Sequence, residues 1–227
     1  ATLHMEKDGK DYVSNPDLYS IATYAYSQLS KATTKENLKV LCANLLRYGA
    51  VTQLYKGYCT DNLPDAKLTE EQRAYLTDLE TVTFDAVNSD LGELADPTVT
   101  WVGKSLILDS KVTLKFIFDA TAYTGDPTAL KLRVNYKNTA GETVTAWVEG
   151  AQLYQASKNR YAFDFDGLLA AELRSTVSVA VFEGSKQLSS TLEYSASTYG
   201  SGKDGQLLTV CQALMAYSDL AKVYFAG

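Results

Sequence analysis

The chain has 227 residues and a net charge of −6, with 46% hydrophobic and 21% charged residues. A chain of this size buries roughly 70% of its unfolded surface, so its core needs no metal ion or disulfide to hold it. Lysine and arginine form no cluster, which argues against nucleic acid and anionic membranes as partners. No apolar run approaches the roughly 20 residues of a membrane-spanning helix.

Helical periodicity marks both ends of the chain. Residues 35–58 carry apolar side chains at helical spacing, and residues 207–225 show the same period. Between them, Thr69 is followed three residues later by Gln72, a capping box that predicts a short helix up to about Leu76. His4-Met5 has the form of a cloning junction, so we expect a vector scar over residues 1–5. These patterns predict three further segments. They are a helical segment at 6–60, a linker with a short helix at 61–97 and a C-terminal helical segment at 196–227.

From about Thr98 the period changes to two. Apolar and polar residues alternate over 112–119, 130–137, 143–148, 161–165, 177–181 and 192–194, and sequences typical of turns separate most of these runs. Short strands with one apolar face predict an antiparallel, Ig-like β-sandwich over residues 98–195. The predicted fold class is therefore α+β, with a sandwich flanked by amphipathic helical segments at both ends.

The two helical segments are related to each other. YSIATY at residues 19–24 resembles YSASTY at 194–199, with four of six positions identical. Further along, five residues recur in register, namely Leu38, Cys42, Leu45, Tyr48 and Tyr55 as Leu207, Cys211, Leu214, Tyr217 and Tyr224. This pattern predicts the closing part of one module followed by a complete module, in a parent built as an array. The alternative is a chance likeness of two amphipathic helices.

Residues 45–55 read LLRYGAVTQLY, residues 58–63 read YCTDNL, and residues 217–225 read YSDLAKVYF. These strings resemble the LLxYGAAAQxYFxYxTDxLA segment and the YxxAAxxYF ending of a repeat module found in large extracellular proteins of gut Clostridia (Lachnospiraceae and Ruminococcaceae). Val51 and Thr52 depart from the family, which tends to have Ala there. The resemblance covers nearly the whole chain. It implies an extracellular, cell-surface or secreted parent with neighbouring modules, and immunoglobulin as a candidate ligand.

The cysteines and the acidic residues give no clear reactive site. Three cysteines form no zinc-ligand pattern and no closed disulfide framework. Cys42 and Cys211 lie on apolar helix faces, where a thiol most often serves as a small buried hydrophobe, and a disulfide between them requires that the two helices touch. Asp164 and Asp166, with Glu149, could form a glycosidase-like carboxylate pair or part of a calcium loop, but alternating solvent-facing positions explain them better.

The only histidine is His4, so outside the predicted scar the chain lacks the base of a Ser-His-Asp or Cys-His system and any histidine metal ligand. The sequence also lacks a phosphate-binding loop and a dinucleotide fingerprint. We therefore expect a protein that is not an enzyme, with no catalytic residue, no metal site and no cofactor.

Trp147 is the residue that suggests binding. It alternates with inward-facing Val148 and therefore points outward. If its strand pairs with the preceding one, Lys131, Arg133 and Asn135 become its neighbours on that face. An exposed tryptophan among hydrogen-bonding side chains suits a protein hot spot or a stacked sugar, whereas a covering helix or loop would make it structural. Trp101, near a strand start, is expected in the core.

These observations predict a non-catalytic binding or adhesion module of a bacterial surface or secreted protein. Its ligand is expected to be a host or bacterial protein, with no nucleic acid partner and no membrane insertion. Two alternatives are a carbohydrate-binding module, with Trp147 and tyrosines as the stacking platform, and a structural spacer that extends other domains. A line of aromatic residues on one sheet face would favour sugar, and the sequence shows no clear line of this kind.

Overall fold

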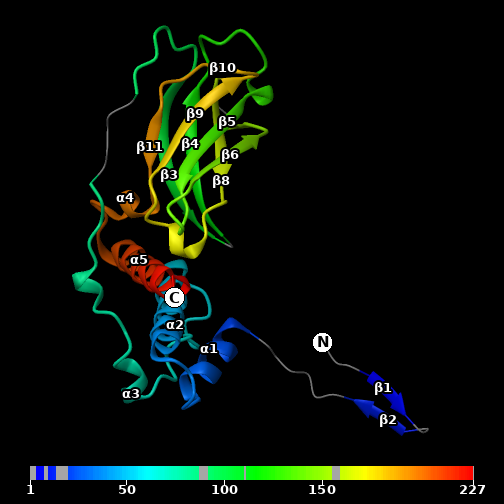
Figure 1. The fold of residues 1–227 in the computed structure, drawn as a ribbon, viewed down its shortest axis with the longest axis vertical. Helices are drawn as coiled ribbons and strands as arrows, with labels where there is room; N and C mark the ends of the chain where they lie inside the picture. The colour runs from blue at the N-terminus through cyan, green and yellow to red at the C-terminus, as the bar shows by residue number, and fades with distance from the viewer. Residues whose placement is uncertain are drawn as a thin grey trace. The chain divides into compact units, whose positions relative to one another are not determined.

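A computed structural model describes residues 4–7, 10–13, 20–86, 92–109, 111–154 and 159–226, the first two ranges by their backbone only. The chain forms two compact units, Ala1–Thr77 and Asp78–Gly227, which are described separately below (Figure 1). Within the described part, no helix has both the length and the apolar character needed to cross a membrane.

The first unit begins with a two-stranded hairpin and continues as helices. Strand β1 (His4–Lys7) pairs antiparallel with β2 (Lys10–Val13), so His4 and Met5 of the predicted scar lie in a strand. Helix α1 (Ile21–Ser30) begins at Ser20, whose hydroxyl accepts a hydrogen bond from the backbone N–H of Thr23. Helix α2 (Glu36–Lys56) ends at Gly57, whose φ of 70° favours glycine.

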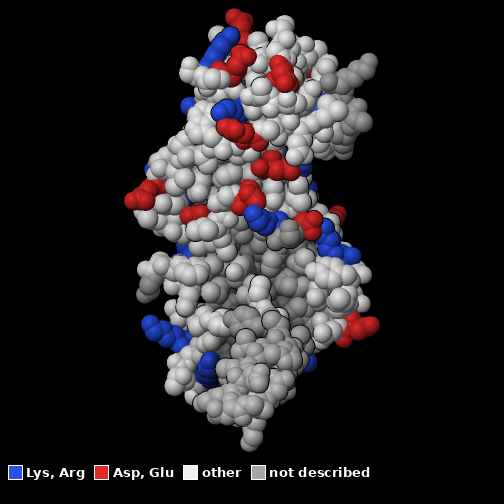
Figure 2. Space-filling view, turned by 90° about the vertical axis from the view of Figure 1, so that its right-hand side faces the viewer, with Lys and Arg blue, Asp and Glu red and all other residues white. Residues whose placement is uncertain are grey.

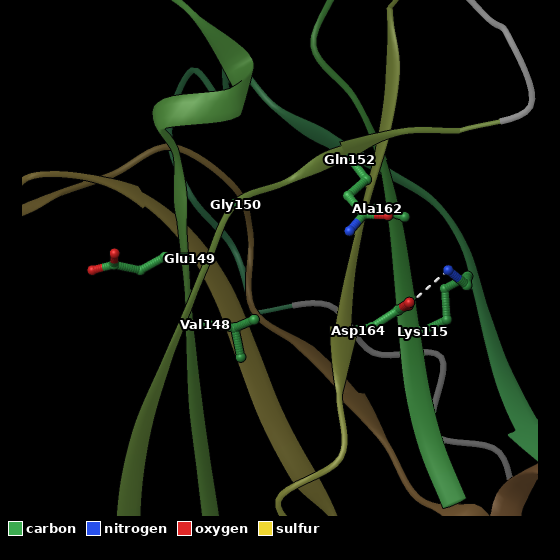
Figure 3. Close-up of a pocket in the computed structure, with 7 residues that line it drawn as sticks. All are labelled: Lys115, Val148, Glu149, Gly150, Gln152, Ala162 and Asp164. Atoms are coloured by element: carbon green, nitrogen blue, oxygen red, sulfur yellow. Dashed lines mark ion pairs between the residues drawn. The ribbon is translucent and has the colours of Figure 1, made fainter. Parts of the chain in front are cut away.

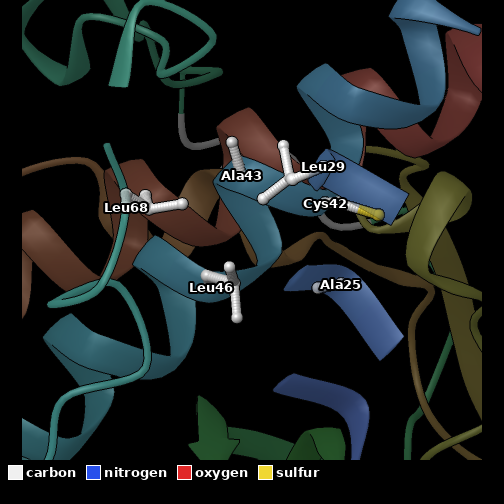
Figure 4. Packing of buried hydrophobic residues seen from close by; sticks show 6 residues of the cluster. All are labelled: Ala25, Leu29, Cys42, Ala43, Leu46 and Leu68. Atoms are coloured by element: carbon white, nitrogen blue, oxygen red, sulfur yellow. The ribbon is translucent and has the colours of Figure 1, made fainter. Parts of the chain in front are cut away.

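Buried side chains from α1, α2 and the segment that follows them form the core of this unit. Figure 4 shows the cluster, which consists of Ala25, Leu29, Cys42, Ala43, Leu46 and Leu68. Helix α3 (Glu70–Arg73) has the predicted capping box, with reciprocal hydrogen bonds between Thr69 and Gln72. The buried Asn44 amide donates to the carbonyl of Tyr75 and accepts from the N–H of Thr77, so it fastens the following segment to α2.

The structure differs from two of the predicted segment boundaries. The helical segment expected from residue 6 begins at Ile21, and β2 precedes it. The Asp8-Gly9 sequence favours a hairpin, a local signal that helical periodicity overlooks. The segment expected as a linker at 61–97 is divided, because residues 61–77 belong to the first unit and the second unit begins at Asp78.

The second unit contains the predicted sandwich. One sheet has the order β3-β4-β8-β7, and the other has the order β10-β9-β5-β6 with β11 also paired to β9. If strands β3 to β10 are lettered A, B, C, C′, D, E, F and G in chain order, the first sheet has the order A-B-E-D and the second has the order G-F-C-C′. This is the strand order of immunoglobulin-type sandwiches. The strand bounds are Thr100–Leu108 (β3), Val112–Asp119 (β4), Lys131–Lys137 (β5), Thr143–Glu149 (β6), Gln152–Leu153 (β7), Arg160–Phe165 (β8), Val177–Glu183 (β9), Lys186–Gln187 (β10) and Leu192–Tyr194 (β11).

Side chains that alternate inward along these strands fill the sandwich. Phe116, Phe118 and Phe163 are almost completely buried. Trp101 packs edge-on against the rings of Phe116 and Phe118, and its indole N–H donates to the carbonyl of Ser190. Trp101 is only partly buried, so the prediction that it belongs to the core holds in part: its ring packs against core residues. The α+β class with an antiparallel sandwich is confirmed.

Three short 3₁₀ helices and two α-helices complete this unit. The 3₁₀ helices are Leu79–Thr81 (η1), Pro127–Ala129 (η2) and Ala170–Glu172 (η3), and the α-helices are Ala196–Gly200 (α4) and Gly205–Phe225 (α5). Phe84 lies against α4, where a Cβ on Gly200 would lie only 2.1 Å from its ring. The Arg174 guanidinium pairs with Asp219 of α5 and donates to the carbonyl of Thr83 and to the hydroxyl of Ser197. Arg174 therefore connects α4, α5 and the segment at Thr83, which precedes the sandwich in the chain.

The predicted repeat extends to matching local structure. Helices α2 and α5 both have 21 residues, and Cys42 and Cys211 are both buried. Ser195 caps α4 through the N–H of Thr198, as Ser20 caps α1 through Thr23. The assignment of the first unit as the tail of a preceding module stays a prediction.

Candidate functional site

The register of β5 and β6 brings the four predicted binding residues onto one face. Lys131 lies opposite Glu149, Arg133 opposite Trp147, and Asn135 opposite Thr145. Directly opposed side chains in an antiparallel pair have Cβ atoms about 5 Å apart. We call the face formed by these six residues together with Phe182 the tryptophan face.

Trp147 lies in the middle of the tryptophan face with 48% of its surface exposed. Its ring meets the Phe182 ring of β9 edge-on, with centroids 5.3 Å apart and an interplanar angle of 79°. No described helix or loop covers Trp147 completely, as its exposure shows. The indole is therefore half supported by the protein and half available to a ligand.

Arg133 is the charged group nearest to the centre of this face. Its guanidinium carbon lies 4.5 Å from the centroid of the Phe182 ring, within the range of a cation–π contact. Its Nε is buried without a hydrogen-bond partner among the described residues. This arrangement holds a cation beside the exposed indole and over an aromatic ring that is only 6% exposed.

The residues on either side of Trp147 are fixed by cross-strand contacts. Lys131 Nζ lies 2.6 Å from Glu149 Oε1, so the charge of this lysine is balanced within the face. Thr145 Oγ1 lies 2.8 Å from Asn135 Oδ1 and donates to it. No ion pair of Arg133 is found among the described residues, which leaves its charge available for a partner's carboxylate.

Phe182 is the part of this face that the sequence analysis did not identify. It lies opposite Lys131 across β5–β9 and out of phase with the inward-facing Val179 and Val181. A large aromatic residue in the outward phase of a strand was the available signal. Its ring supports both the indole of Trp147 and the guanidinium of Arg133, so it determines how these two groups are presented.

The carboxylates that could suggest hydrolysis do not converge. A cavity of about 90 Å³ is lined by Lys115, Val148, Glu149, Gly150, Gln152, Ala162 and Asp164. Figure 3 shows that Asp164 points to Lys115, whose Nζ lies 2.7 Å from Asp164 Oδ1, whereas Glu149 points away from both. Asp166 hydrogen-bonds Lys111, and this bond and charge hold the pKa of its carboxyl below the usual range.

The described part of the chain contains no group of three or more His, Cys, Asp or Glu residues placed to hold a metal ion. On the face shown in Figure 2, acidic and basic side chains are interspersed and do not gather into an extended patch of one sign.

The first unit has a larger cavity of about 300 Å³, lined by α1, the end of α2 and residues 62–67. The lining includes Tyr26 and Gln53, and Gln53 Oε1 is buried without a partner among the described residues. The described residues that line this cavity include no Asp, Glu, His or Cys.

Comparison with known proteins gives little further guidance. No family model and no curated protein matches the chain. Among solved structures, a crystal structure of S. aureus TarS (residues 217–571) aligns at 9% identity with a TM-score of 0.24. The alignment covers 77% of this chain and 62% of the TarS fragment. A score this low carries no argument about fold or activity.

Proposed function

We propose that this chain is a non-catalytic binding module that engages a protein ligand through the tryptophan face. The half-exposed Trp147 beside Arg133 is the observation that carries the proposal. Tryptophan and arginine are the residues most enriched at hot spots, where truncation costs at least about 2 kcal/mol. Both side chains project from paired strands and contact Phe182, so they lose little freedom when a ligand binds.

A protein ligand fits this face better than a polysaccharide. Sugar-binding faces commonly stack several exposed aromatic rings, whereas Phe182 is buried beneath Arg133 and Trp147. Among the described residues of β5, β6 and β9, Trp147 is the only exposed aromatic side chain on this face. Aromatic residues and arginine are enriched at protein interfaces, and the rim of such an interface is polar.

The resemblance to extracellular modules of gut Clostridia supports a location at the bacterial surface or in the secreted fraction. It also makes immunoglobulin the first ligand to test. The role we propose is adhesion to a host or bacterial protein, within a parent that carries neighbouring modules.

An affinity panel tests the proposed class of ligand. The immobilised full chain is exposed to purified immunoglobulin G, immunoglobulin A and mucin, with serum albumin as the control protein, and to insoluble polysaccharides in parallel. We expect retention of a protein ligand and no retention by polysaccharide. Retention by polysaccharide alone would favour a carbohydrate-binding module, and no retention by any probe would favour a spacer.

A further inference from the structure

The sandwich has long and short sheet edges, and most of them are protected against pairing with another chain. Exposed strand edges are usually kept short, interrupted by a bulge, covered, or supplied with an inward-pointing charge. Edge strand β7 has two residues. Strands β10 and β11, at the far margin of the other sheet, have two and three residues. The N–H groups of Thr98 and Val99 and the bridge from Gly92 to Thr191 cover part of that margin.

Strand β3 is a long edge with two protective features. Its pairing with β4 is interrupted by a register shift between Trp101 and Gly103. Lys104, opposite the buried Phe116, points toward the interior and donates to the carbonyl of Glu193. A bulge and an inward lysine both discourage a further strand from adding at this edge.

Strand β6 is different. Thr143–Glu149 pairs with β5 in seven consecutive positions without a shift, and among the described residues it pairs with no other strand (Figure 1). Its sequence, TVTAWVE, has no proline and no lysine or arginine, and it consists mainly of residues with high strand propensity. A long, regular and uninterrupted edge is a template for another strand.

The sequence of β6 is complementary to itself. If two copies of β6 pair antiparallel about a two-fold axis through Ala146, all seven residues find a partner. Thr143 then faces Glu149, Val144 faces Val148, and Thr145 faces Trp147. No like charges are opposed, and each indole gains a β-branched neighbour, a favourable cross-strand pair.

We infer that β6 is a dimerisation edge, at which a second copy of this chain adds its own β6 to form one continuous sheet. The two-fold axis stands perpendicular to the sheet, so the tryptophan faces of both copies lie on the same side. Trp147 of one copy and Trp147 of the other become diagonal neighbours, about 7–8 Å apart and within reach of each other's rings. Dimerisation therefore joins two tryptophan faces into one surface, and it does not depend on the identity of any ligand.

Sedimentation velocity of the full chain, over a wide range of concentrations, tests this inference. We expect a monomer–dimer equilibrium for the natural sequence. Thr143→Glu places a carboxylate opposite Glu149 twice in the symmetric dimer and should weaken association about tenfold. Thr143→Lys places an ammonium opposite Glu149 twice and should strengthen it.

The stability of the monomer provides an internal control, because Lys137 Nζ lies 2.7 Å from Thr143 Oγ1. Within one copy, Thr143→Glu should pair with Lys137 and stabilise the fold, whereas Thr143→Lys should repel Lys137 and destabilise it. The two variants therefore move the melting temperature, measured at concentrations where the chain is monomeric, in the direction opposite to dimer affinity. A general effect on folding would move both in the same direction.

The inference is overturned if the natural chain remains a monomer at every concentration, which would leave the edge to a foreign strand. It is equally overturned if a dimer forms and neither Thr143→Glu nor Thr143→Lys changes its affinity.

Discussion

Cys42 and Cys211 occupy the same position in two helices of equal length. Each is the seventh residue of its 21-residue helix, counted from Glu36 in α2 and from Gly205 in α5. Burial raises the pKa of both thiols to about 11. Both cysteines are unbonded, and the third, Cys59, is exposed.

These environments predict the reactivity of the thiols. Because only the thiolate is nucleophilic, raised pKa values and burial should make Cys42 and Cys211 slow to react near neutral pH. We expect one rapid equivalent in a colorimetric thiol assay of the native chain, removed by Cys59→Ser, and three equivalents after unfolding. Rapid reaction of a second thiol in the native state would contradict the equivalent burial of the two helices.

The same shifts predict a loss of stability at alkaline pH. A thiol whose pKa is raised on folding stabilises the folded state while both states are protonated, and this advantage is lost as the unfolded chain ionises above its ordinary pKa. The free energy of unfolding should therefore fall between about pH 9 and pH 11. Cys42→Ala or Cys211→Ala should reduce the slope over that range, and Cys59→Ala should leave it unchanged. An unchanged slope in both buried variants would show that other groups titrate there.

Asn44 provides a test of the first unit. Its side chain is 2% exposed and connects to Tyr75 and Thr77, so Asn44→Ala removes the side-chain partners of a half-buried carbonyl and a half-buried N–H. We expect a loss of about 1–3 kcal/mol in the unfolding free energy of this unit. The exposed Asn62→Ala is the control.

Tryptophan fluorescence separates the effect on the two units, because Trp101 and Trp147 both belong to the second unit. Asn44→Ala should lower the temperature at which the part of the far-ultraviolet circular dichroism signal from α1 and α2 is lost, whereas the part from α5 of the second unit should be lost at the same temperature as the tryptophan signal. It should leave the tryptophan transition in place. An equal shift of both transitions would mean that the two units unfold together.

Much of the fold follows from periodicity in the sequence. Alternation over 112–119 and 130–137 predicts β4 and β5, and Thr69 with Gln72 predicts the cap of α3. Strand β3 is harder to recognise, because the register shift between Trp101 and Gly103 breaks its alternation. Helix α1 is short and begins at a polar cap, so its apolar face extends over too few residues to give a strong period.

The candidate site was only partly predictable. Alternation places Trp147, Lys131, Arg133 and Asn135 on one face, because their pairing depends on a short turn between neighbouring strands. Phe182 could not be added in this way. It lies 45 residues beyond Lys137, the end of β5, and a pairing between strands so far apart in the chain leaves no period in the sequence. The hydrogen bonds of Arg174 are non-local for the same reason.

Arg174 should contribute more to stability than a surface ion pair. Its Nη2 lies 2.8 Å from Asp219 Oδ2, its Nε also pairs with Asp219, and its Nη1 reaches Thr83 and Ser197. Hydrogen bonds to a charged group contribute about 1.5–3 kcal/mol, so we expect Arg174→Ala to lower the unfolding free energy of the second unit by about 2–3 kcal/mol.

The exposed Lys131–Glu149 pair is the control within the same unit, because exposed pairs contribute less than about 1 kcal/mol. Chemical denaturation followed by tryptophan fluorescence measures both variants, Arg174→Ala and Lys131→Ala. Equal losses would show that Arg174 acts as an ordinary surface charge. Arg174→Lys should recover only part of the loss, because a lysine cannot form the two parallel bonds to Asp219.

The acidic residues of β8 and its end should have no catalytic role. Asp164 and Asp166 each pair with a lysine, and the lowered pKa of Asp166 keeps it ionised near neutral pH, where it cannot act as a proton donor. We expect no turnover of glycosides, esters or peptides, and no change on adding a chelator. Hydrolysis that Asp164→Asn or Asp166→Asn abolishes would contradict this expectation.

Titration of immunoglobulin, or of another protein retained by the affinity panel, against the Trp147→Ala variant is the most direct test of the proposed function. Loss of an exposed anchor predicts binding at least about tenfold weaker. Loss of the edge-on contact with Phe182 costs only about 0.5–1.5 kcal/mol, so the melting temperature should fall by a few degrees.

Val102→Ala, which shortens a side chain 46% exposed on β3 of the other sheet, should change neither quantity appreciably. For Trp147→Ala we expect weakened ligand binding together with a melting temperature within a few degrees of that of the natural chain. Unchanged affinity would contradict it, and so would a loss of about 3–5 kcal/mol in stability, the cost expected for a tryptophan that belongs to the core.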